Sequence, residues 1–272
     1  MGMLTRLILL LFGFMVMNGS SVAATGTILK VGGTGSSVGF MKLLGQQYRI
    51  HHPDITIEVL PSLGSSGGIR ALQSGAIDLA VASRPLKEKE KKGVREYLLG
   101  TSPFVFAVHP DTNADNLTDS QLVDIYRGNL STWPDGTQIR RILRPTNDTD
   151  WLLMQTISPE LAQALEVASH TEGLYLAVTD SDAVSYLERV VGSFGVTTLA
   201  IIDAEQRKVK ILSYRGIDPK VPSAIAPYPL LKTYRMAVKS HAPTAVTDFI
   251  GFIFSDQGKQ VLGEVGIVLT DG

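Results

Sequence analysis

Alternating and continuous apolar positions predict a short strand, a helix and a second strand between residues 55 and 82. Apolar residues at 55, 57 and 59 alternate with polar ones, which predicts a strand with one buried face. Residues 69–73 predict a helix, and residues 76–82 predict a buried strand. The run Gly-Ser-Ser-Gly-Gly at 64–68 separates the first strand from the helix.

An earlier segment has the same order of elements. Residues 28–31 predict a strand, residues 32–35 a tight loop, and residue 36 onward a helix with Phe40, Leu44 and Tyr48 on one face. Two such units in succession predict a parallel sheet with right-handed crossovers, and therefore an α/β fold.

Three segments of the chain are candidates for binding an anion. Ser65 and Ser66 lie in a Gly/Ser loop before a helix, where unpaired N–H groups and hydroxyls can hold an oxyanion. Ser83 and Arg84 follow the next strand, at the sheet edge where ligands of open α/β sheets bind. Arg144 ends a predicted strand beside a helix start, which suits either an oxyanion or a surface salt bridge.

Composition limits the partners and indicates export. Lys+Arg 25 against Asp+Glu 26 gives a net charge of -1, which offers no support for binding nucleic acid. Arg6, an apolar run at 7–17 and small residues at 18–24 predict a signal peptide of residues 1–24. A membrane anchor is the alternative, although spanning needs about 20 apolar residues. Without cysteine the chain has neither disulfides nor a lipid-bearing thiol, so we expect it to be unanchored in a periplasm or outside the cell.

Other motifs admit further interpretations. Residues 35–39 match the G-x-S-x-G nucleophile elbow around Ser37, which would indicate a hydrolase, but no histidine is marked out as its partner. The glycines at 33, 35 and 39 approach a dinucleotide fingerprint without the later acidic residue. The charge run 87–92 predicts an exposed helix face, and His51-His52 predicts a solvated helix end in preference to a metal site. We expect no cofactor.

These segments together resemble the phosphate-binding receptors of bacterial ABC importers, which are type II periplasmic binding proteins. The resemblance covers the whole chain after residue 24, and its carriers are GTGSSV at 33–38, GSSGGIRAL at 64–72, IDLAVASRPL at 77–86, IYRGNLSTWPDG at 125–136, GSFGV at 192–196 and DFIGFIFSDQGKQVLGEVG at 248–266. It implies two α/β lobes, each a mostly parallel sheet flanked by helices, with hinge crossings between them. The expected lobes are residues 25–108 plus 231–272, and residues 109–230.

The resemblance also implies which residues contact the ligand. In the first lobe these are Ser37, Val38, Ser65 and Ser83, and in the second lobe Arg144 matches the family's arginine. Neighbouring donors complete the expected ligand set: Ser36, Ser66, Arg84, Thr146, Asn147 and Thr149. The family's best-known members have a carboxylate where Ser83 stands, and Ser-Gly-Thr where residues 148–150 read Asp-Thr-Asp. We expect the two aspartates to point away from the ligand as helix caps, or to pair with Arg140, Arg141 or Arg144.

The function expected from the resemblance is capture of phosphate or a similar tetrahedral oxyanion for delivery to an ABC permease. Alternatives are a receptor of the same fold for another small anion or carboxylate serving a sensor, a serine hydrolase using Ser37, and a scaffold without a ligand. The expected form is a monomer.

Overall fold

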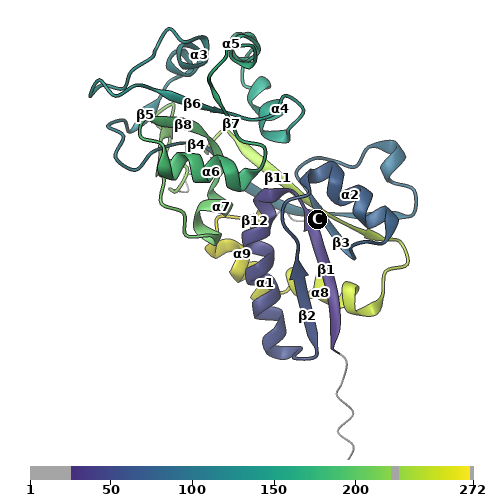
Figure 1. Ribbon diagram of the computed structural model, residues 1–272. Coiled ribbons are helices and arrows are strands. Elements are labelled where there is room, and N and C mark those ends of the chain that lie inside the picture. Colours follow the sequence, from purple (N-terminus) through teal and green to yellow (C-terminus); the bar gives the residue numbers. More distant parts are fainter. Residues whose placement is uncertain (1–25, 222–226, 270–272) are drawn as a thin grey trace, which may run out of the picture.

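The chain forms two lobes joined by two long strands. The computed structural model describes residues 26–221 and 227–269, so the predicted signal peptide lies outside the described residues. One lobe contains helices α1 (Val38–His51), α2 (Gly64–Ser74), α8 (Thr244–Ile253) and α9 (Asp256–Glu264), and the other contains α3 (Asp119–Arg127), α4 (Thr149–Gln155), α5 (Pro159–Ser169) and α6 (Asp180–Arg189) (Figure 1). No helix in these two ranges has the length and apolar character that crossing a membrane requires.

The first lobe is built on the two strand–loop–helix units that the sequence predicts. Strands β1 (Thr27–Gly33), β2 (Ile55–Val59) and β3 (Leu79–Ala82) are parallel, with β1 in the centre. All four residues of β3 are buried, as its continuous apolar run predicts. Helix α2 begins at Gly64, so the predicted Gly/Ser loop forms its first turn.

The two connecting strands run antiparallel to their neighbours. Strand β4 (Val94–Val108) pairs with β11 (Leu231–Lys239) up to Pro103 and then with β8 (Ser193–Thr198) from Phe104 onward. The sheet of each lobe is therefore mixed, although the two-lobed α/β fold is the one predicted. The crossing lies within β4, before the expected lobe boundary after residue 108, and the exact lobe boundaries remain a proposal.

The second lobe surrounds β8. Strand β6 (Arg140–Leu143) is parallel to both β8 and β7 (Tyr175–Leu176).

The remaining elements of both lobes are short. They are the strands β5 (Asn116–Leu117), β9 (Lys210–Ile211), β10 (Ser213–Tyr214) and β12 (Val268–Leu269), the helix α7 (Leu199–Ala204), and the 3-10 turns η1 (Gly35–Ser37) and η2 (Glu88–Glu90).

Each lobe has its own apolar core. In the first, Phe40, Leu44 and Tyr48 of α1 pack with residues of β11 and α8, as their helical spacing predicts. In the second, Phe104, Phe106, Trp133, Trp151 and Phe194 are buried together. Two separate cores leave the surface between the lobes available for polar groups.

Candidate functional site

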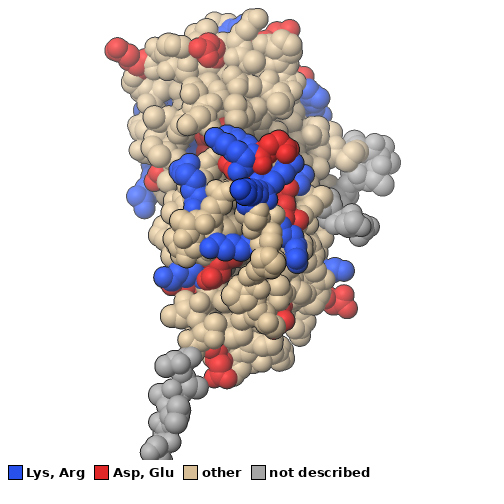
Figure 2. Space-filling view, turned by 90° about the vertical axis from the view of Figure 1, so that its right-hand side faces the viewer, with Lys and Arg blue, Asp and Glu red and all other residues tan. Residues whose placement is uncertain are grey.

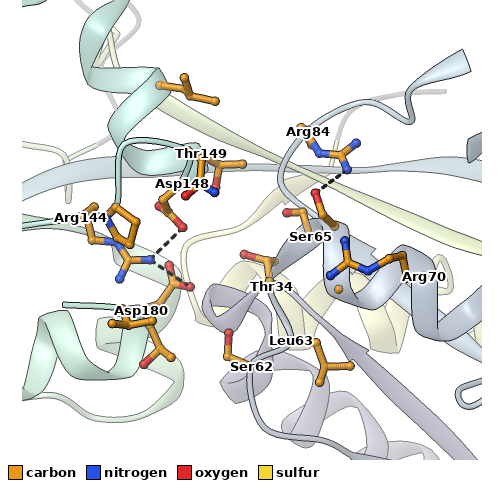
Figure 3. Close-up of a pocket in the computed structure, with 18 of the residues that line it drawn as sticks. Thr34, Ser62, Leu63, Ser65, Arg70, Arg84, Arg144, Asp148, Thr149 and Asp180 are labelled. Atoms are coloured by element: carbon orange, nitrogen blue, oxygen red, sulfur yellow. Dashed lines mark hydrogen bonds and ion pairs between the residues drawn. The ribbon is translucent and has the colours of Figure 1, made fainter. Parts of the chain in front are cut away.

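A cavity of about 500 Å³ lies between the two lobes. Its walls come from the start of α2 and the segment after β3 on one side, and from the starts of α4 and α6 on the other (Figure 3). The lining consists of Thr34, residues 62–67, Arg70, Arg84, Lys87, Arg144, Pro145, residues 147–149, Leu152 and residues 178–180.

The start of α2 forms the first wall. Leu63 precedes the helix and provides no side-chain cap, so the N–H groups of the first turn have no side-chain acceptor there. Ser65 and Ser66 add hydroxyls at the same end, where the helix dipole favours an anion. Gly68 brings the helix close to the sheet, since a Cβ atom at this position would lie 2.6 Å from Gly33 Cα.

Ser83 joins the two walls through hydroxyl groups. Its N–H donates to Ser65 Oγ at 3.0 Å, and its Oγ lies 3.3 Å from Thr34 Oγ1 and 2.9 Å from Thr149 Oγ1 in the second lobe. Ser83 itself lines a neighbouring hollow and not the main cavity. Its hydroxyl therefore acts as a bridge between lobes in this structure.

The positive charge of Arg84 is already balanced by Glu90. Arg84 Nη1 and Nη2 each donate to one Glu90 carboxylate oxygen at 2.8 Å, and Nη2 also donates to Ser66 Oγ at 2.9 Å. The hydrogen bonds from Arg84 lower the pKa of Glu90 to about 2.

The prediction of an exposed helix face for residues 87–92 is wrong, because this run forms the short turn η2 and buries Glu90.

Arg70 and Lys87 supply cationic side chains at the mouth of the cavity. Both line it, and both are exposed. Figure 2 views the molecule from the side that carries α2 and shows Lys and Arg side chains gathered across the middle of this face. Neither residue forms an ion pair with a carboxylate in the part of the chain that the structure describes. These two residues therefore carry most of the uncompensated positive charge near the site.

Arg144 lies in the second wall and is only 2% exposed. Its Nη1 donates to the carbonyl oxygen of Ala177 at 2.9 Å. Its Nη2 approaches carboxylate oxygens of Asp148 at 3.1 Å and Asp180 at 3.8 Å, and its Nε approaches Asp150 at 3.6 Å. Neither Nε nor Nη2 makes a hydrogen bond of good geometry within the described residues. Arg144 is thus a buried cation that retains donors for another acceptor.

Lys232 of β11 completes this ion cluster. Its Nζ contacts the Asp150 carboxylate and lies 3.3 Å from Asp180 Oδ1. Burial, followed by repulsion from neighbouring carboxylates, raises the pKa of Asp150 to about 6. Asp148 Oδ1 accepts from the N–H of Asp150 at 2.9 Å and so caps α4, as the sequence predicts. The expectation that Asp148 points away from the ligand is wrong, because Asp148 lines the cavity.

Two of the arginines considered as partners for these aspartates bind elsewhere. Arg140 donates to the carbonyl oxygen of Val191, and Arg141 donates to that of Tyr126.

The predicted ligand contacts divide into two sets. Six line the cavity: Ser65, Ser66, Arg84, Arg144, Asn147 and Thr149. Five do not: Ser36, Ser37, Val38, Ser83 and Thr146. Their roles toward a ligand stay predictions.

Contacts around η1 explain why its serines are outside the cavity. Ser37 Oγ donates to the carbonyl oxygen of Thr34 at 2.8 Å, and Ser36 Oγ lies 3.1 Å from Thr34 Oγ1. Asp180 of the second lobe also lies against this turn, because a Cβ atom on Gly35 would be 2.6 Å from Asp180 Oδ2.

Sequence reasoning missed Thr34, Ser62, Arg70, Lys87, Thr179 and Asp180 as cavity residues. Arg70 had a usable signal: it stands four residues after Ser66, which places both on one face of a helix that begins at Gly64. For Asp180, only a cap motif at the start of α6 is visible in the sequence.

Comparison with known proteins agrees with this architecture. The profile of the PBP superfamily domain matches residues 18–257. Phosphate-binding protein PstS 2 of Streptococcus pneumoniae serotype 4 is 30% identical over 105 residues, covering 39% of this chain and 36% of that protein. Phosphate-binding protein PstS of Staphylococcus saprophyticus is 34% identical over 116 residues, with the same shares. The chain thus aligns with little more than a third of the length of these relatives.

The similarity to solved structures extends over almost the whole fold. A putative phosphate ABC transporter substrate-binding protein with bound phosphate from Clostridium perfringens superposes with a TM-score of 0.75 at 21% identity, covering 90% of this chain and 100% of that one. At this identity the likeness shows a common fold. Since the family profile matches most of the sequence, the chain belongs to the PBP superfamily.

Proposed function

We propose that this protein is a periplasmic receptor that captures phosphate or a similar tetrahedral oxyanion and presents it to an ABC permease. The observation that carries the proposal is one interlobe cavity that combines the uncapped start of α2, its serine hydroxyls and the buried guanidinium of Arg144. The relatives named as phosphate-binding proteins support the same assignment.

Binding in this proposal couples ligand capture to lobe closure. The first wall offers N–H groups and the hydroxyls of Ser65 and Ser66, while the second offers Thr149, Asn147 and Arg144. A ligand that touches both walls favours the arrangement in which they are close, because only that state completes its contacts. The permease would then meet a closed, loaded form.

The proposal includes the form and location of the protein. Residues 1–24 would be removed on export, leaving a monomer with lobes formed by residues 25–108 plus 231–272 and by residues 109–230, without a cofactor and without nucleic acid as a partner. The hydrolase alternative has less support. Ser37 Oγ already donates to a main-chain carbonyl, and the residue is 3% exposed.

A thermal-shift scan tests the proposed function. The purified protein is stripped of ligand by unfolding and refolding, and phosphate, arsenate, sulfate, molybdate, tungstate and small carboxylates are added separately. A ligand at about a hundred times its dissociation constant adds roughly 2.7 kcal/mol of stability, which for a chain of this size raises Tm by about 5 to 10 °C. Phosphate or arsenate should give such a rise.

The variant for this scan is Arg70→Gln, with Arg49→Gln as its control. Arg70 lines the cavity, whereas Arg49 is exposed near the end of α1. Arg144→Ala is less suitable, because it would remove one of the two buried cations that balance Asp148, Asp150 and Asp180, the other being Lys232. The phosphate shift should shrink in Arg70→Gln alone. A larger shift with a carboxylate, or no shift with any oxyanion, would contradict the proposal.

A further inference from the structure

The two walls of the cavity carry net charges of opposite sign. Arg70, Arg84 and Lys87 line the first wall, and Glu90 is the carboxylate paired with Arg84. Three cations and one carboxylate give this wall a net charge of +2. The start of α2 adds partial positive charge on the same side.

The second wall has an excess of carboxylates. Arg144 and Lys232 are surrounded by Asp148, Asp150 and Asp180. Three carboxylates and two cations leave this cluster with a net charge of -1 when all are ionised. Asp148 and Asp180 line the cavity itself, and the Asp148 side chain is the more accessible, at 23% against 8% exposure. A donor on the ligand can therefore reach a carboxylate oxygen on this side.

Arg144 gives independent evidence that a ligand completes the second wall. The residue is 2% exposed and lines the cavity, yet its Nε and Nη2 lack hydrogen-bond partners of good geometry. Buried donors in folded proteins are normally paired. Free N–H donors on a guanidinium that lines the cavity can donate to an oxygen of a ligand. Figure 3 shows Arg144, Asp148 and Asp180 facing the cleft, across from Ser65 and Arg70.

Apolar side chains also line the cavity, beside the charged groups of both walls. Leu63, Leu152 and Val178 line the cavity and are 40%, 48% and 65% exposed, respectively. They come from three different segments and from both lobes. Covering them with a ligand's methylene groups is favourable, at about 0.8 kcal/mol for each methylene removed from water, or roughly fourfold in affinity.

We propose that the site binds an oxyanion linked through a short carbon chain to a protonated amine, as in an aminoalkylphosphonate or an aminoalkyl phosphate ester. The oxyanion would meet the start of α2, Arg70 and Lys87 and would accept from Arg144, while the ammonium would donate to Asp148. A phosphate monoester carries about -1.5 to -2 at pH 7, so with one ammonium its charges are opposite to those of the two walls. Inorganic phosphate offers the negative second wall a P–OH donor but no positive charge. The inference rests on the proposed function, because it refines the ligand of the same site.

Calorimetric titration with four probes tests this inference: inorganic phosphate, ethylphosphonate, 2-aminoethylphosphonate and O-phosphoethanolamine. Ethylphosphonate and 2-aminoethylphosphonate differ by the amine alone, and the phosphate ester separates recognition of a C–P bond from that of the shared phosphoryl group. A charged hydrogen bond to Asp148 should make 2-aminoethylphosphonate bind at least about tenfold more tightly than ethylphosphonate.

Asp148→Asn should abolish that preference and strengthen ethylphosphonate binding, because it removes a negative charge beside Arg144 in the cavity wall. Asparagine caps helices as well as aspartate does, so this variant keeps the start of α4 folded. Asp182→Asn is the matched control, since it removes a charge from the first turn of α6 but lies outside the cavity lining. The preference should survive in the control.

The outcomes separate the inference from the proposed function. If phosphate binds and the amine gives no advantage, or if the advantage persists in Asp148→Asn, the inference is wrong and the phosphate receptor stands. If the amino compounds bind and phosphate does not, the inference stands and phosphate is excluded as the ligand. If no probe binds, both are wrong.

Discussion

The hydroxyl oxygens of Ser83 and Thr149 lie 2.9 Å apart, although Ser83 follows β3 in the first lobe and Thr149 begins α4 in the second. This contact closes the cavity on one side and separates it from the neighbouring hollow that both residues line. The side chain of Ser83 therefore has a structural role, because its hydroxyl links the two lobes. Its N–H also donates to Ser65 Oγ within the first lobe.

Thr149→Val should remove this link at nearly constant side-chain volume. A hydrogen bond of this kind contributes roughly 1 kcal/mol, so Tm should fall by about 2 to 4 °C. Thr156→Val is the control, because Thr156 Oγ1 bonds only within its own helix end. Scanning calorimetry measures both, and an equal loss in the two variants would mean that the interlobe hydrogen bond contributes no more than the local one of Thr156.

Lys232→Met should destabilise the protein far more than an exposed lysine change does. The substitution removes one of the two buried cations beside Asp150 and Asp180, the other being Arg144, and breaking a buried ion pair costs about 3 to 5 kcal/mol. Denaturant titration measures the loss. Lys239→Met, at the exposed end of the same strand, should change the unfolding free energy by less than about 0.5 kcal/mol.

Adding Asp150→Asn to Lys232→Met separates charge from packing. Replacing the Asp150 carboxylate, which has lost its Lys232 partner, should recover part of the lost unfolding free energy, because an amide is less costly to bury than a charge. No recovery in the double variant would show that the Lys232 side chain contributes through packing instead.

The contrast between Ser65 and Lys232 shows what the sequence could reveal. Ser65 lies in a local Gly/Ser pattern between a strand and a helix, and parallel topology brings it to the same sheet edge as Ser83. Lys232 and Asp150 are 82 residues apart, and no local pattern links them. Their pairing depends on the antiparallel placement of β11 beside β3 and β4, which hydrophobic periodicity does not specify.

Glu90 illustrates the same limit within a short segment. Its charge run has the alternation of a solvated helix face, but Arg84 draws Glu90 into the protein and the run forms a turn. Arg84 was predicted near the oxyanion and does line the cavity, while the carboxylate that balances it is six residues away and looks like one of many surface charges.

The Arg84–Glu90 pair should make stability depend on acid pH. Since the pKa of Glu90 is lowered from 4.5 to about 2 in the folded protein, the pair stabilises fully above pH 4.5. This contribution is lost as pH falls from 4.5 toward 2. The difference in unfolding free energy between wild type and Glu90→Gln should therefore be largest near pH 6 and shrink by pH 3. Glu88→Gln, whose side chain is 89% exposed, should show no such trend, and a parallel trend in both would contradict the assignment.

Gly68→Ala should both destabilise the protein and weaken anion binding, because α2 packs directly on the backbone of β1. The new Cβ atom would lie 2.6 Å from Gly33 Cα and 3.2 Å from its nitrogen, so the helix must move away from the sheet. Overpacking of this kind costs about 1 to 3 kcal/mol, and the displacement of α2 also moves Ser65 and Ser66.

Gly251→Ala is the matched control for Gly68→Ala. That glycine is also helical and has nothing within 4 Å of its Cβ position, so alanine should stabilise α8 by up to about 1 kcal/mol and leave binding unchanged. Denaturant titration and calorimetry with phosphate measure the two effects, and unchanged binding in Gly68→Ala would show that the position of the α2 start does not limit affinity.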